Sequence, residues 1–169
     1  WKELRRLEAR AKEALSPSTL VDLGQVYINM GMIDHSLRVA DEGLALFPQS
    51  DALKKLKKFA KKTQLNKAIK GLRVRLNKGP TPVLYKEIAD LYLELGDFGA
   101  VHGTAEECIR RFPDDAGAYL VLAKARLTNF YRDISARDGI EAVRGLEKVV
   151  ELDSENVKAH KLLAEVLYR

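Results

Sequence analysis

One short motif recurs along this chain, and its recurrence constrains the fold more than any other feature. In each copy a Leu or Ile is followed at once by a small residue, within apolar positions spaced three and four apart. The small residues of the four clearest copies are Gly24, Ala89, Ala123 and Ala164. Ala89 and Ala123 are 34 positions apart, Ala123 and Ala164 are 41 apart, and Gly24 and Ala89 are 65 apart, close to twice 33. A period of this length predicts stacked units that bury a shared core.

Each clear copy reads as two helices joined by a turn. Residues 18–47 and 83–112 carry the helical period, and each is broken once, at Gly31 and at Gly96. Glycine can adopt the left-handed conformation that ends a helix. Helix starts are predicted where a hydroxyl residue precedes proline, at 16–17 and 81–82, with further capping candidates at Asp114, Asp115 and Asn156.

The wide gap between Gly24 and Ala89 predicts a further copy near residue 57. Residues 53–60 supply a first helix, and residues from Ala68 to Pro80 supply a second, with Lys57 in place of the small residue. We therefore expect a degenerate helix hairpin over 51–80.

The spacing also places an insertion of about seven residues near 129–138. Ser135, followed three residues later by an acid, resembles a capping box for the next helix. Two interpretations remain open. Phe130 and Tyr131 either pack back on the core of a lengthened hairpin, or they form an exposed element that confers specificity.

Composition excludes two classes of protein. Of the 169 residues, 46% are hydrophobic and 31% are charged, which is typical of a folded domain and not of a disordered tail. No apolar run approaches the roughly 18 residues of a membrane-spanning helix. The chain starts at Trp1 and not at methionine, so we expect it to be part of a longer protein.

Cys108 is the single cysteine, which excludes an internal disulfide and a cysteine-based zinc site. Its position late in a second helix predicts a buried, inert thiol. A chain with a single cysteine and therefore no internal disulfide favours a reducing, cytoplasmic setting.

Basic charge is concentrated in one stretch. Residues 52–78 hold 11 basic residues and no acid, whereas the rest of the chain holds 18 basic and 24 acidic residues. Such an uneven distribution of charge bears on which partners the chain binds, and it does not indicate the fold.

No motif points to catalysis. His35, His102 and His160 lie in separate hairpins without ligand spacing, so we expect no metal. The sequence has no glycine-rich phosphate loop and no nucleophile elbow. We expect Gly99 and Gly103 to permit close helix packing. The chain is therefore predicted to be no enzyme and to use no cofactor.

The copies together resemble the tetratricopeptide repeat (TPR) family. Its 34-residue unit combines a large apolar residue, Leu-Gly or Leu-Ala, a tyrosine, a small residue early in the second helix and a late proline. The resemblance spans about 17–169. It implies an all-α, right-handed superhelical solenoid of antiparallel helix hairpins, acting as a non-catalytic protein–protein interaction scaffold. The expected segments are a capping or partial-repeat helix at 1–15, repeats at 16–50, 51–80 (degenerate and basic), 81–114 and 115–155 (with the insertion), and a further first helix or cap at 156–169.

The resemblance also implies a concave groove lined by the first helices, which would bind a partner segment. The candidate partner-binding residues are Gln25, Asn29, Lys54, Lys58, Lys61, Lys62, Lys86, Asp90 and Lys124. Neighbouring groove positions are Val21, Ile28, Leu93, Glu94, Leu120, Leu127, Thr128, Lys161 and Glu165.

Several partners remain open. An acidic peptide or protein segment comes first, because the lysines attract and steer it. Nucleic acid binding through the basic 54–78 helix pair is the alternative, although Phe59 is the one aromatic residue there that could stack on bases. An anionic membrane surface comes third, and the lysine-rich face could also serve solubility alone. Apolar Leu163 and Leu167 near the chain end suggest self-association.

Overall fold

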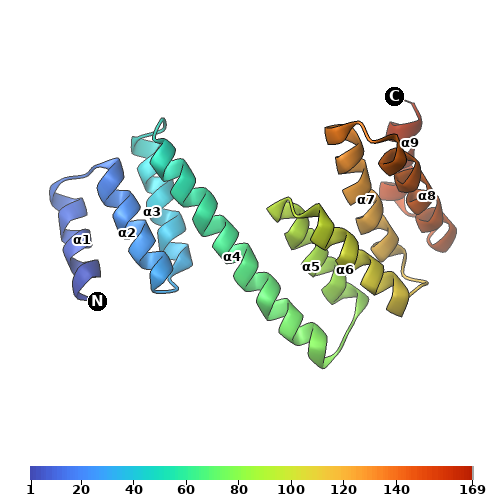
Figure 1. The fold of residues 1–169 in the computed structure, drawn as a ribbon, viewed down its shortest axis with the longest axis horizontal. Helices are drawn as coiled ribbons and strands as arrows, with labels where there is room; N and C mark the ends of the chain where they lie inside the picture. The colour runs from blue at the N-terminus through green and yellow to red at the C-terminus, as the bar shows by residue number, and fades with distance from the viewer. Residues whose placement is uncertain (169) are drawn as a thin grey trace. The chain divides into compact units, whose positions relative to one another are not determined.

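The chain is all-α, as predicted. A computed structural model describes residues 1–168, except for the side chain of Lys12, and within these residues it contains nine helices and no strand (Figure 1). The helices are α1 (Lys2–Glu13), α2 (Pro17–Asn29), α3 (Ile33–Leu46), α4 (Asp51–Lys78), α5 (Pro82–Leu95), α6 (Phe98–Arg111), α7 (Ala116–Asp133), α8 (Ala136–Leu152) and α9 (Val157–Leu167).

The first compact unit comprises residues 1–68 and contains α1, α2, α3 and the beginning of α4. Its core joins Leu20 and Ala40 of the α2–α3 hairpin to Leu53 and Leu56 of α4. On the other side, α1 covers α2, and the Tyr27 hydroxyl donates a 2.7 Å hydrogen bond to Glu8. The amphipathic N-terminal helix therefore covers the apolar face of the first hairpin.

The second compact unit begins at Ile69 and holds the α5–α6 and α7–α8 hairpins followed by α9. Helix α5 lies beside α7, so the first helices of successive hairpins are neighbours. The Tyr85 hydroxyl donates a 2.8 Å hydrogen bond to Glu107, and Arg73 of α4 lies 3.5 Å from the same carboxylate. The end of α4 is thereby attached to the α5–α6 hairpin.

The predicted helix caps and turns are confirmed except at Asp114, because the neighbouring Asp115 caps α7. The side chains of Ser16, Thr81 and Ser135 each accept a hydrogen bond from the backbone N–H three residues later, at 3.2 to 3.3 Å. Asp115 and Asn156 cap α7 and α9 in the same way. Gly31 and Gly96 have φ of +76° and +74°, the left-handed region where glycine has no steric penalty.

The predicted hairpin over 51–80 is wrong, because α4 is one continuous helix of 28 residues. In the flanking repeats the turn glycine follows the small residue by seven positions, as Gly31 follows Gly24. The corresponding residue here is Gln64, which favours a helix and donates a 2.9 Å hydrogen bond to Asp34 of α3. Nothing at this position stops the helix.

The insertion lengthens helices and forms no long loop. Helix α7 has 18 residues and α8 has 17, against 14 in both α5 and α6. Phe130 packs against Gly139, where an added Cβ would lie 2.9 Å from its ring. Tyr131 is more exposed, with its ring centroid 5.1 Å from that of Phe130. The inward-packing interpretation therefore holds for Phe130.

Small repeat residues mark close contacts. Gly24, Ala89 and Ala123 are buried, whereas Ala164 is exposed because no described helix packs on that side of α9. Gly99 and Gly103 were expected to permit close helix packing, and this prediction is wrong. Both are exposed, and a Cβ on Gly103 would meet no atom within 4 Å.

Candidate functional site

An open pocket of about 480 Å³ lies in the second unit, on the side of the first helices. Its walls come from α5, α6, α7 and α9. The lining residues are Leu93, Phe98, Lys124, Leu127, Thr128, Tyr131, Lys158 and Leu162. Mostly apolar walls with a few polar groups are the usual composition of a binding pocket.

Lys124 is the half-buried cation of this pocket. It lies on α7 one turn after Val121 and one turn before Leu127, both of which are buried. Burial and, after it, the Lys158 side chain within hydrogen-bonding reach together lower the pKa of Lys124 to about 8. The pocket thus holds an amine that gives up its proton more readily than an ordinary lysine.

The charges around Lys124 come from two neighbouring helices. Lys86 and Asp90 lie exposed on α5, where Lys86 disfavours the protonated amine and Asp90 favours it. Lys158 contributes its charge from the start of α9. Lys124 therefore feels two neighbouring lysines and one carboxylate, and the two cations that line the pocket itself are Lys124 and Lys158.

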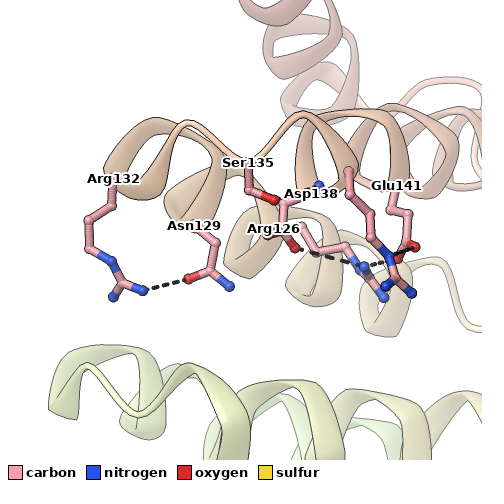
Figure 2. Close-up of polar contacts among 7 residues, drawn as sticks. Arg126, Asn129, Arg132, Ser135, Asp138 and Glu141 are labelled. Atoms are coloured by element: carbon pink, nitrogen blue, oxygen red, sulfur yellow. Dashed lines mark hydrogen bonds and ion pairs between the residues drawn. The ribbon is translucent and has the colours of Figure 1, made fainter.

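Aromatic side chains form another edge of the pocket. The Arg132 guanidinium lies 4.8 Å from the centroid of the Phe98 ring, a cation–π geometry between α7 and α6. Figure 2 shows Arg132 donating to Asn129, at 3.3 Å, one turn earlier on α7. These contacts orient the end of α7, where Tyr131 lines the pocket.

A partly buried ionic cluster joins α7 to α8. Arg126 stands where the repeat pattern has tyrosine, and it pairs with Glu141 and lies 4.0 Å from Asp138 (Figure 2). The exposed Arg137 also contacts Glu141, with its Nε 3.1 Å from Glu141 Oε1. Ion pairs here replace the packing of an aromatic ring.

The predicted partner-binding residues divide between the two units. In the second unit, Lys86 and Asp90 influence the charge of Lys124 electrostatically, and Lys124 lines the pocket. In the first unit all of the others are exposed: Gln25 and Asn29 on α2, and Lys54, Lys58, Lys61 and Lys62 on α4. The Gln25 amide donates a 3.2 Å hydrogen bond to Asn29 Oδ1, and Lys54 Nζ lies 3.8 Å from Asp51 Oδ1.

Sequence reasoning missed Lys158 and Phe98 as pocket residues, whereas Tyr131 belongs to the segment for which an exposed element conferring specificity was one interpretation. Lys158 precedes the predicted groove residue Lys161 by three positions and so shares its helix face, a spacing that could have identified it. Phe98 and Tyr131 come from a second helix and from the lengthened end of α7, outside the repeat pattern.

Other reactive groups lie apart from the pocket. Cys108 is buried as predicted, and burial raises the pKa of its thiol to about 11. Among residues 1–168 no group of three or more His, Cys, Asp or Glu side chains is arranged to hold a metal ion. No helix in that range is long and apolar enough to cross a membrane.

Comparisons with known proteins agree with the repeat pattern. The sequence profile of the tetratricopeptide repeat matches residues 82–125. The fold is similar to that of a thermophilic TPR protein from Thermus thermophilus, with a TM-score of 0.52 and 16% identity over 98% of this chain and 89% of that chain. It is also similar to a tetratricopeptide repeat protein from Parabacteroides merdae, with a TM-score of 0.50 and 16% identity over 97% of this chain and 63% of that chain. A sequence comparison with curated proteins finds no significant match.

Proposed function

We propose that this tetratricopeptide repeat chain is a non-catalytic scaffold that binds a segment of a partner protein over its first helices. One observation carries the proposal. The face formed by α5, α7 and α9 combines an apolar pocket with two lysines in its lining, Lys124 and Lys158, and with Lys86, whose charge acts on Lys124. A pocket with apolar walls accepts a side chain of the partner, and the rest of the segment lies across the neighbouring helices.

The charge at this face supports an acidic partner. Lys158 and Lys86 both disfavour the protonated form of Lys124, and Asp90 opposes them, so an added carboxylate near Lys124 relieves the repulsion among the amines. Burial of Lys124 strengthens this attraction, because water screens it less than it screens an exposed pair. The favoured segment therefore carries an apolar side chain beside an acidic one.

A random peptide library displayed on phage and selected against the whole chain tests this function. Selected peptides are expected to be rich in Asp and Glu around an apolar residue, and to bind Lys124→Glu or Lys158→Glu at least about tenfold more weakly. Lys70→Glu, an exposed substitution on α4, is the control with the same change of charge. Peptides that bind all four proteins equally would contradict the proposal.

Nucleic acid binding is the second candidate, and the first part of α4 favours it. Phe59 is half exposed on this helix, and exposed Lys55 and Lys62 lie one turn to either side of it. An aromatic ring between cations can stack on a base while the lysines contact phosphates. Titration with single-stranded RNA at low and moderate salt tests this candidate. An affinity that falls steeply with salt in the wild type, and is lost in Lys54→Glu/Lys58→Glu/Lys61→Glu, would favour nucleic acid.

Self-association through α9 remains a prediction. Leu163 is half-buried against α8, whereas Leu167 is 65% exposed. Light scattering of the wild type and of Leu167→Asp over a range of concentrations checks it. A wild type that stays monomeric at high concentration would exclude it.

A further inference from the structure

Two lysine amines meet on the wall of the apolar pocket. Lys124 comes from α7 and Lys158 from α9, and their side chains are within hydrogen-bonding reach of each other. Two adjacent amines repel each other when both are protonated, so one of them gives up its proton more readily than an isolated lysine. A neutral amine beside an ammonium group is an activated nucleophile.

We propose that Lys124 is a site of covalent acylation, which takes a short acyl group from an acyl thioester and holds the acyl chain in the pocket.

In the reaction, the unprotonated Lys124 nitrogen attacks the thioester carbonyl carbon. A C–N bond forms, the C–S bond breaks, and the products are an amide and a thiol. The proton lost by the nitrogen is taken up by the leaving thiolate, and nothing is oxidised or reduced. The Lys158 ammonium lies beside the amine, where it can stabilise the negative charge that develops on the carbonyl oxygen.

Reactivity depends on the groups that face Lys124. Lys158 on α9 and Lys86 on α5 disfavour its protonated form, while Asp90 on α5 opposes them. With a pKa of about 8, roughly one Lys124 amine in ten is unprotonated near pH 7, against about one in three thousand for a lysine at 10.5. A less basic amine is a weaker nucleophile, which offsets part of this gain and leaves an advantage of about tenfold.

The pocket also selects the acyl group. Leu93, Phe98, Leu127 and Leu162 form its apolar walls, and a space of about 480 Å³ is ample for a chain of a few carbons. Burial of each methylene is worth about a fourfold increase in binding. A butyryl group is therefore favoured over an acetyl group at Lys124, and not at an exposed lysine.

Acylation would remove one charge and fill the pocket, so it would also block a partner segment there. The chemistry needs no partner and is independent of the proposed function. A failure of the acylation experiment therefore leaves the peptide experiment unaffected.

Competition among the chain's own lysines tests the proposal. The whole chain is incubated near pH 7 with small amounts of the acetyl or butyryl thioester of N-acetylcysteamine, and peptide mass spectrometry gives the rate at each lysine. Lys124 is expected to react at least about tenfold faster than exposed Lys58 and Lys161, and faster with the butyryl than with the acetyl donor. Equal rates at Lys124 and Lys161 would overturn the proposal.

Three variants identify the cause of the reactivity. Lys158→Gln is expected to slow Lys124 severalfold, whereas Lys158→Arg, which keeps the charge, is expected to preserve most of its rate. Lys161→Gln removes a charge from the same helix and should leave Lys124 unchanged. Circular dichroism confirms that each variant is folded. A Lys124 rate that does not respond to Lys158→Gln would also overturn the proposal.

Discussion

Leu56 of α4 fills the space beside Gly24 of α2, where an added Cβ would lie 2.4 Å from Leu56 Cδ2 and 3.2 Å from Cδ1. Both residues are buried. Because a protein interior is packed as densely as an organic crystal, one extra methyl group must displace the leucine. We expect Gly24→Ala to lower the free energy of unfolding by about 1–3 kcal/mol in chemical denaturation. A variant as stable as the wild type would contradict this close contact.

The same substitution at Gly71 is expected to have the opposite sign. Gly71 is exposed inside α4, and a Cβ there would meet no atom within 4 Å. Replacement of an exposed helical glycine by alanine lowers the entropy of the unfolded chain without a clash. Gly71→Ala should therefore raise the free energy of unfolding by about 0.5–1 kcal/mol. A loss of stability would mean that α4 does not continue as a helix through residue 71.

Arg126 and Arg137 contact one carboxylate, Glu141, from different environments. The Arg126 side chain is 18% exposed and that of Arg137 is 87% exposed. Loss of Arg126 removes the cation beside the partly buried Asp138 and leaves Glu141 with the exposed Arg137, so Arg126→Leu should cost about 1–3 kcal/mol of unfolding free energy. Arg137→Leu should cost less than about 0.5 kcal/mol, as is typical of an exposed ion pair. Equal losses in denaturation experiments would show that the ionic cluster does not stabilise the α7–α8 hairpin.

Cys108 should react very slowly with a thiol reagent. Its side chain is buried, and burial raises the pKa of the thiol from 9.0 to about 11. Since the thiolate is the reactive form, this shift alone lowers the rate about a hundredfold relative to the unfolded chain. Absorbance after addition of a disulfide reagent measures the rate, in native buffer and in denaturant. Rapid labelling of the native chain would show that the site opens readily.

The repeat pattern predicted the fold wherever a specific residue ends a helix. Gly31 and Gly96 are in the left-handed conformation, and Ser16 and Thr81 cap helices at the expected places. The prediction was wrong at α4, where apolar spacing alone suggested two helices. Apolar periodicity describes which face of a helix is buried, and it does not say where the helix stops. Gln64 lacks the conformational freedom of a turn glycine, and this difference was visible in the sequence.

The pocket could be predicted only in part. Repeat positions of the first helices correctly indicate that Lys86, Asp90 and Lys124 are close together, because these helices are neighbours in the stack. Phe98 and Tyr131 reach the pocket through helix ends whose lengths the repeat does not determine. The low pKa of Lys124 could not be predicted either, because it depends on burial and on the distance to Lys158.

Lys124 should make stability depend on pH in a defined window. Its pKa is lowered to about 8 in the folded chain, whereas a lysine in the unfolded chain titrates near 10.5. Between these values the unfolded chain binds more protons than the folded chain, so the contribution of Lys124 to stability rises as the pH increases. Below about pH 8 both states are protonated, and the penalty for the buried charge is constant.

Replacement of the amine isolates this contribution from those of other groups. The difference in unfolding free energy between the wild type and Lys124→Met should move in favour of the wild type by about 1 kcal/mol across this window, after allowance for the water that screens a half-buried amine. Urea denaturation at a series of pH values measures the difference. Lys161→Met, an exposed substitution on α9, is the control and should show a difference that does not vary with pH. If both variants follow the same pH dependence, Lys124 has the proton affinity of an ordinary surface lysine and the amine pair at the pocket does not form.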